Sequence, residues 1–200
     1  MKDDLFVTGK IIKKYYLPLD EIEELNEKYE KVKNTLGSLK KLLIGRLDSE
    51  LEFTKILQST KIFKTIVDCM NDYIEFSIKA HNLKPGDYHL EILRCWINDM
   101  KEHEYNPPHT HHDRTGWSTV LFLKVPEFIN DVTSEHKFLD GHLGFLSTNG
   151  IDQQWMKPNV GDFYIFEASH QHCVMPFKVK NKGDIRRSMS FNFIQNEKNV

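Results

Sequence analysis

The sequence predicts a mainly β protein, a sandwich or jelly roll, whose first part is helical. Two observations predict it. Up to about residue 85, apolar residues recur at the three- and four-residue spacing of amphipathic helices, and beyond it they alternate with the period of two that strands have. The chain has 200 residues, enough for one domain with a substantial core. We therefore expect a single domain over 1–200, with a helical part at 1–85 and a strand-rich core at 86–200.

The first part contains two predicted helices. Asp20 and Glu23 have the spacing of a capping box, so the first helix is expected to begin beside them. Gly37 stands where a C-terminal glycine cap belongs. A second helix is predicted over 60–81, and the dipeptide at 85–86, Pro-Gly, predicts a turn after it. The apolar stripe of the first helix consists of Ile22, Leu25, Tyr29, Val32 and Leu36.

The second part contains the predicted strands. Turn signals separate short alternating segments, which is typical of a sandwich or jelly roll. A turn is expected at 159–162. The segment 127–140 has no clear period and is expected to be a surface loop that could act as a lid. We expect strands at 88–97, 117–125, 141–146, 163–167, 174–179 and 185–194.

Charge and cysteine content exclude several classes of partner. The net charge is -2, from 27 basic and 29 acidic residues, so there is no electrostatic case for nucleic acid or an anionic membrane surface. No apolar run approaches the roughly 20 residues that span a bilayer, and the N-terminus lacks the apolar stretch of a signal peptide. Three widely spaced cysteines are more typical of reduced thiols than of a disulfide framework. We therefore expect a cytoplasmic protein without a membrane partner.

A dense run of histidines occupies residues 106–113, with the sequence NPPHTHHD. His109 and His111 are two residues apart, so on a strand their side chains share a face, as a metal site requires. Imidazole nitrogen is a ligand that Fe(II) accepts. His111 and Asp113 have the same spacing, and with His172 they would form a two-histidine, one-carboxylate triad. Both registers remain open from the residues alone. We prefer His172 to His170 because it directly precedes the predicted strand at 174–179.

The last predicted strand has two faces of different character. One face carries polar side chains, which is unusual for a core and suited to a pocket, although an outward solvent face is the alternative. An arginine offers a rigid fork for a carboxylate, and a hydroxyl two residues further on adds another donor. The polar face is Arg186, Ser188, Ser190 and Asn192, and the other face is Arg187, Met189, Phe191 and Phe193.

Together these stretches resemble the Fe(II)- and 2-oxoglutarate-dependent oxygenases, more narrowly the prolyl-hydroxylase-like group found in tailed phages and marine bacteria. The matching segments are 106–111, 117–126, 158–177 and 186–192, which cover the second half. The resemblance implies one oxygenase domain with a double-stranded β-helix, a jelly roll, and helices packed on its outside. It implies that His109, His111 and His172 hold Fe(II). It also implies that Arg186 and Ser188 bind the far carboxylate of 2-oxoglutarate.

The chain departs from the wider superfamily in one respect. That superfamily uses His-x-Asp or His-x-Glu, whereas His109 and His111 would leave the iron without a protein carboxylate. Charge neutralisation would then fall to the bound oxoacid. The register of His111 and Asp113 would restore the carboxylate. The first register is preferred because the Asn-Pro-Pro-His-x-His frame is the one that matches the narrower group.

The implied activity is that of a dioxygenase. The cofactors are Fe(II) and 2-oxoglutarate, with ascorbate as reductant; the partners are O2 and an unknown substrate. The implied reaction hydroxylates a peptidyl proline-like group or a small molecule, with release of succinate and CO2. The alternatives are an oxoacid-independent cupin-type dioxygenase and a non-catalytic metal-binding or virion-structural module. A homo-oligomer is compatible with the sequence, and a phage-encoded chain would act in the host cytoplasm.

Overall fold

The computed structural model describes residues 9–39, 45–84, 86–111, 116–129, 139–147 and 153–197. Within these ranges the strands form two antiparallel sheets. The large sheet has the strand order β1 (Ile12–Tyr16), β8 (Asp162–Glu167), β5 (Trp117–Lys124), β10 (Arg186–Glu197), β3 (Tyr88–Met100) and β2 (Glu50–Glu52). The small sheet has the order β4 (Asn106–His109), β9 (His172–Val174), β6 (Leu143–Phe145) and β7 (Gln154–Met156).

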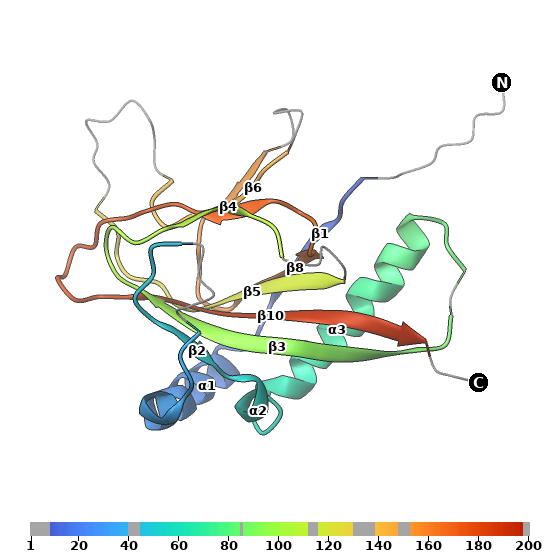
Figure 1. Ribbon diagram of the computed structural model, residues 1–200, viewed down its shortest axis with the longest axis horizontal. Coiled ribbons are helices and arrows are strands. Elements are labelled where there is room, and N and C mark those ends of the chain that lie inside the picture. Colours follow the sequence, from blue (N-terminus) through green and yellow to red (C-terminus); the bar gives the residue numbers. More distant parts are fainter. Residues whose placement is uncertain are drawn as a thin grey trace.

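The helices cover one face of the large sheet, and the small sheet lies on the other side (Figure 1). The helical elements are α1 (Leu19–Val32), the 3₁₀ turn η1 (Lys33–Thr35), α2 (Thr54–Leu57) and α3 (Ile62–Ala80). This arrangement confirms the predicted mainly β jelly roll with helices outside it. None of the helices in the described ranges is long and apolar enough to cross a membrane.

Alternation along the strands divides the core into two layers. Leu121 and Leu123 point from β5 toward the helices, where they join the main apolar cluster. Val120 and Phe122 point from the same strand to the other side, into a cluster that also holds residues of β6 and β8. Because successive side chains of a strand face opposite ways, one apolar run can supply both layers.

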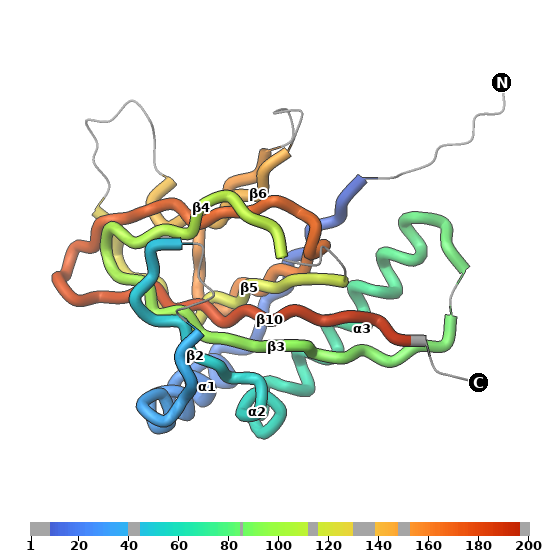
Figure 2. The backbone as a smooth tube through the Cα atoms, in the orientation of Figure 1, coloured from blue at the N-terminus to red at the C-terminus, as the bar shows by residue number. Residues whose placement is uncertain are grey.

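The long strands β3 and β10 run side by side over most of their length (Figure 2). Their register places Arg186 opposite Met100 and Ser188 opposite Asn98. On the other side of β10, Ser188 lies opposite Phe122 of β5. The polar face of β10 is therefore turned toward the space between the sheets, which is where a pocket can form.

Several element boundaries differ from the sequence-based expectation. The capping box is wrong, because α1 begins at Leu19 after Pro18 and no side chain caps it. The glycine cap at Gly37 is also wrong: the helix passes into η1, which ends at Thr35, and Leu36 after it is already extended. The strand expected at 174–179 is instead β9, His172–Val174. The helix expected at 60–81 is confirmed as α3, whereas β1, β2, α2, β4 and β7 were not predicted as separate elements.

The turn predicted at 159–162 is confirmed, since the amide of Asp162 donates to the carbonyl of Asn159 at 3.1 Å. Gly161 has a φ of +87°, a conformation that only glycine adopts readily. Most of the expected loop at 127–140 lies outside the described residues, as does Pro85 of the expected 85–86 turn.

Candidate metal centre and cofactor pocket

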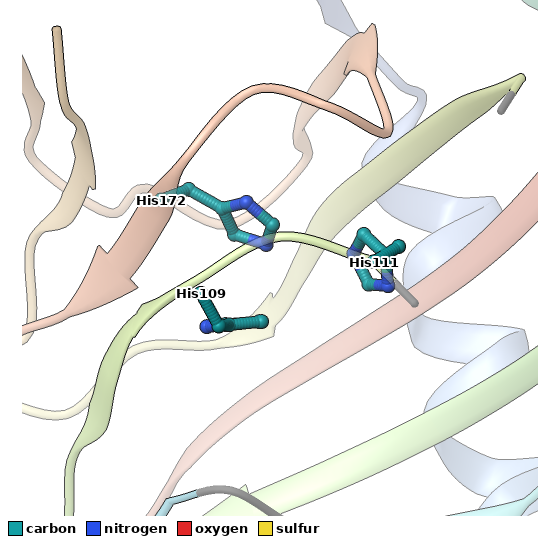
Figure 3. Close-up of side chains that lie close together, drawn as sticks. All are labelled: His109, His111 and His172. Atoms are coloured by element: carbon teal, nitrogen blue, oxygen red, sulfur yellow. The ribbon is translucent and has the colours of Figure 1, made fainter. Parts of the chain in front are cut away.

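Three histidines converge between the two sheets (Figure 3). His109 ends β4 and His172 begins β9, and the two lie opposite each other in the small sheet. His111 follows two residues after His109. One ring nitrogen from each lies within 4.8 Å of those of the other two, close enough for a single ion. Asp113, the carboxylate of the alternative register, lies outside the described residues.

Backbone carbonyls orient two of the three rings. His109 donates from Nδ1 to the carbonyl of Pro107 at 2.8 Å, and His172 donates from Nδ1 to the carbonyl of His170 at 2.9 Å. A carbonyl only accepts, so in each ring Nδ1 carries the proton and Nε2 keeps its lone pair. This is the tautomer that a metal ligand needs. The competing residue His170 thus contributes its backbone, while its own ring packs against Phe145, with centroids 5.4 Å apart.

His111 has side-chain partners instead. Its Nε2 lies 2.8 Å from Ser118 Oγ, and its Nδ1 lies 3.2 Å from Asn192 Nδ2. Asn192 Oδ1 is buried without a hydrogen-bond partner in the described part of the chain. A 180° turn of the Asn192 amide would bring that oxygen to Nδ1 and give His111 the same tautomer as the other two rings.

Burial favours the neutral form of two of the rings, His109 and His172. It lowers the pKa of His172 well below the usual value, and the neighbouring His109 and His111 lower it further. Burial also lowers the pKa of His109, against a smaller opposing effect of the Pro107 carbonyl. Neutral imidazole is the form that binds a metal, so the site needs little proton release before an ion enters.

Arg186 lies fully buried in the same cavity as the histidines. Its Nε donates to the carbonyl of Gly141 at 3.0 Å, and its guanidinium carbon lies 4.7 Å from the ring centroid of Phe122. Nη1 contacts only the sulfur of Met100, at 3.4 Å, and Nη2 has no hydrogen-bond partner among the described residues. Burial without a counter-ion lowers the pKa of Arg186 to about 9. A buried cation in this state favours an anionic ligand.

The adjacent arginine has a different role. Arg187 points from the opposite face of β10 toward α1, where its Nη2 lies 2.7 Å from Glu30 and 2.9 Å from Asp99. Its guanidinium carbon stacks 4.3 Å from the ring centroid of Tyr29. All of its charge is therefore matched within the fold. The alternation along β10 separates the two arginines as expected, and Arg186 is the one that lines the cavity.

Besides the predicted site residues, side chains from two further strands line the cavity. Trp96 and Asn98 of β3 line it, and Ser118 of β5 lines it beside His111. Ser188, the predicted partner of Arg186, lines it too. Alternation along β3 could have placed Trp96 and Asn98 on one face. Only the pairing of β3 with β10 shows that this face meets the site.

Comparison with known proteins agrees with this geometry. Residues 94–192 match the family model described as "Putative 2OG-Fe(II) oxygenase". The matched segment contains all five of the predicted site residues. No curated protein matches the sequence.

Solved structures with the same fold include several oxygenases. A prolyl-4-hydroxylase from Pseudomonas putida aligns at TM-score 0.56 and 16% identity, over 96% of this chain and 94% of its own. A Trichoplax adhaerens prolyl hydroxylase, in complex with a hypoxia inducible factor peptide fragment, aligns at 0.60 and 13%, over 93% and 83%. HygX from Streptomyces hygroscopicus, with nickel and 2-oxoglutarate bound, aligns at 0.56 and 11%, over 93% and 82%.

This chain spans only 44% of the length of a further oxygenase, from Burkholderia pseudomallei, which aligns at TM-score 0.41 and 17% identity over 53% of this chain. The three longer alignments establish a shared fold. With the family match they confirm the predicted resemblance to the Fe(II)- and 2-oxoglutarate-dependent oxygenases, prolyl hydroxylases among them. Fe(II) and 2-oxoglutarate are the cofactors that this family implies.

Proposed function

We propose that this 2OG-Fe(II) oxygenase is a hydroxylase in which His109, His111 and His172 hold Fe(II), while Arg186 and Ser188 bind the far carboxylate of 2-oxoglutarate. One observation carries the proposal: a fully buried arginine, whose Nη2 has no partner among the described residues, lies in the same cavity as three converging histidines. A purely structural arginine would be expected to have a counter-ion, as Arg187 does.

The three imidazoles fit Fe(II). Burial lowers the pKa of His109 and His172, and hydrogen bonds to backbone carbonyls fix both rings in the tautomer that presents Nε2. No carboxylate joins the cluster within the described ranges, so a dianionic oxoacid would supply the negative charge that balances the ion. When bound, Fe(II) and 2-oxoglutarate supply the activation of O2 and the oxidative decarboxylation that yields succinate and CO2.

The chain's own residues bind and orient 2-oxoglutarate, and they exclude water from the site. The carbonyl of Gly141 and the ring of Phe122 hold the Arg186 guanidinium in place, so its remaining N–H groups form a fixed donor for a carboxylate. Ser188 lies two residues along the same face of β10 and adds a hydroxyl donor. The position between two sheets keeps bulk water away from both groups.

The substrate that we propose is a peptidyl proline-like group or a small molecule. The names of two solved structures with this fold support a peptidyl substrate, because both are prolyl hydroxylases and one contains a bound peptide. Ascorbate would serve as reductant. The free thiols Cys69, Cys95 and Cys173 suit the reducing cytoplasm that we propose as its location.

The proposal is tested by titrating 2-oxoglutarate into the anaerobic Fe(II) protein. We expect a visible charge-transfer band from the iron–oxoacid chelate, and succinate formation when O2 is admitted. Replacing Arg186→Ala should raise the 2-oxoglutarate concentration at half-saturation by at least about tenfold, the effect of losing a charge-assisted bidentate contact, and leave iron binding intact. Arg46→Ala, at an exposed arginine, serves as the control.

Other results would favour the alternatives. Oxygen consumption that does not depend on 2-oxoglutarate would favour a cupin-type dioxygenase. Stabilisation by metal, with neither a band nor oxoacid binding, would favour a non-catalytic module. An unchanged 2-oxoglutarate requirement in Arg186→Ala would remove Arg186 from the proposed role.

A further inference from the structure

A second polar cluster lies where β2 pairs with β3, on the face of β3 that lines the cavity. These two strands form one edge of the large sheet (Figure 1). Glu50 lies directly opposite Asn98, and Glu52 lies opposite Trp96. Residues directly opposite in an antiparallel pair share a face, with Cβ atoms about 5 Å apart. Because Asn98 and Trp96 line the cavity, the Glu50 side chain lies on the cavity side of the sheet.

Both residues of this pair are largely buried, and each presents an acceptor oxygen that no described residue binds. Glu50 is 9% exposed and Asn98 is 8% exposed. Asn98 Oδ1 has no hydrogen-bond partner in the part of the chain that the structure describes. The Glu50 carboxylate likewise makes no hydrogen bond or ion pair with a described residue, although the charge of Arg94 acts on it from a distance.

Arg94 is already engaged elsewhere. Its Nε lies 3.5 Å from Glu52 Oε2, and its side chain is 51% exposed. Burial raises the pKa of Glu50 to about 7, and Arg94 opposes that rise without cancelling it. The positive charge of Arg94 thus leaves the Glu50 carboxylate largely uncompensated.

Glu104 shows what a satisfied buried glutamate looks like in the same protein. It is 6% exposed, and its carboxylate accepts hydrogen bonds from the amides of Asp48 and Lys101 at 3.0 and 2.8 Å. Glu50 has no such donors in the described ranges. Buried polar groups without partners are uncommon in folded proteins and concentrate at functional sites. An unpartnered Asn98 oxygen beside a Glu50 carboxylate that no described residue binds therefore points to a donor that arrives with a ligand.

We propose that Glu50 and Asn98 form a subsite for a cationic nitrogen group of the substrate, an ammonium or a guanidinium. A neutral N–H donor would satisfy Asn98 but leave the Glu50 charge unmatched, whereas a cation satisfies both. The Trp96 ring offers an aromatic surface beside them. It lies 5.9 Å from the ring of His111, so the subsite adjoins the metal ligands.

This inference rests on the proposed function, since it names the kind of substrate that the oxygenase site receives. The cation could belong to a free small molecule or to a lysine or arginine side chain of a peptide. The two sources share one chemistry and are separated by the choice of probe.

The test measures binding by calorimetry to the anaerobic protein loaded with Fe(II) and 2-oxoglutarate. The free probes are methylguanidinium and butylammonium, with N-methylurea and butanol as neutral analogues. The peptide probes are alanine pentapeptides with a central arginine or lysine, and citrulline or norleucine replaces that residue in the neutral forms. We expect at least one cationic probe to bind at least about tenfold more tightly than its analogue.

Glu50→Gln should abolish that preference, because it keeps the shape of the side chain and removes the charge. Glu91→Gln is the matched control: it removes one charge from an exposed position on β3 and should leave the preference within about twofold. Tighter binding of the cationic peptide than of the free cation would show that the substrate's cation belongs to a peptide, and the reverse would show that it belongs to a small molecule.

The subsite is overturned if cationic and neutral probes bind equally, if none of them binds, or if Glu50→Gln keeps the preference. The 2-oxoglutarate titration of the same samples separates this failure from that of the proposed function. An intact titration without cation preference rejects only the subsite, while a wild-type protein that takes up no oxoacid rejects the function itself. Should Glu50→Gln fail to fold, the wild-type comparison of charged and neutral probes still decides.

Discussion

At the scale of single residues, the site combines groups that the fold satisfies with groups that it leaves unsatisfied. The histidines His109 and His172 have their Nδ1 protons bound by backbone carbonyls. Arg186 and Asn98, in contrast, retain buried polar atoms without partners among the described residues. The unsatisfied groups are the ones to which we assign ligands, because a fold keeps such groups at a loss of stability.

Glu50 gives a stability prediction whose sign follows from its pKa. Burial raises that pKa from 4.5 in the unfolded chain to about 7 in the folded protein. The folded state therefore binds a proton more tightly, and this contribution to stability is complete below pH 4.5 and lost as the pH rises through 7. Glu50→Gln should stabilise the protein at pH 8, by on the order of 2 kcal/mol, and change little at pH 4.

Urea unfolding at the two pH values measures this effect. Glu104→Gln is the comparison, and it should destabilise at pH 8 because Glu104 already has its donors. A loss of stability in Glu50→Gln at pH 8 would mean that the Glu50 carboxylate already has a donor or a counter-ion within the fold.

Asn192 is expected to orient His111. Partners of the second ring nitrogen usually contribute 10- to 100-fold to metal affinity, so Asn192→Ala should weaken Fe(II) or Mn(II) binding by roughly that factor. Competition with a chelator measures the affinity. Asn196→Ala, at the end of the same strand and bonded to Glu91, is the control. Equal metal affinities of the two variants would show that Asn192 does not orient His111 for metal binding.

The sequence predicted some of these residues and could not predict others. The i, i+2 spacing in the histidine run left two ligand registers open, and the family resemblance favoured His109 and His111. The alternation along the last strand agreed with the choice of Arg186 that the resemblance implied. Those roles stay predictions. Glu50 and Asn98 could not be found in this way. Their relation depends on the pairing of two strands far apart in sequence, and β2 is only three residues long, too short to show a period.

At the scale of elements, β10 is the strand that connects the cavity with the helical layer. It pairs with β3 on one side and β5 on the other, and its two faces serve the cavity and the helical layer. The helical layer is attached through Arg187, which contacts Asp99 of β3 and Glu30 of α1. This contact ties one helix to the two longest strands.

Breaking that contact should destabilise the fold. Arg187→Met keeps much of the side-chain volume and removes the charge, so it leaves the largely buried Asp99 without its cation. We expect a loss of about 3 kcal/mol in the free energy of unfolding. Lys180→Met, which breaks the exposed pair with Glu127, should change stability little. Equal effects of the two substitutions, measured by urea unfolding, would contradict the structural role of Arg187.

Element boundaries were less predictable than element types. The apolar stripe of α3 and the alternation of β5 and β10 are long, so the periodicity located them well. The errors occur at boundaries that the local sequence does not determine. Pro18 precedes α1, and no side chain caps the helix. Strand β9 forms at His172–Val174 because β4 and β6 pair with it there. Local sequence does not report such pairings.

At the scale of the whole molecule, the first part of the chain does more than cover the barrel. Strands β1 and β2 extend the large sheet at its two edges, and α1 and α3 share the main apolar cluster with β5, β8 and β10. That residues 1–200 fold as one domain remains a prediction. We expect a single cooperative unfolding transition, with a midpoint that rises when metal and 2-oxoglutarate are added. Two separate transitions in calorimetry would indicate that the helical part folds independently.

The most direct test of the account is a crystal structure of the protein with Fe(II), or Mn(II) in its place, and 2-oxoglutarate bound under anaerobic conditions. We predict that the metal is held by the Nε2 atoms of His109, His111 and His172. We also predict that the far carboxylate of the oxoacid accepts hydrogen bonds from Arg186 and Ser188. A metal held by Asp113 in place of His109, or an oxoacid carboxylate bound away from Arg186, would contradict it.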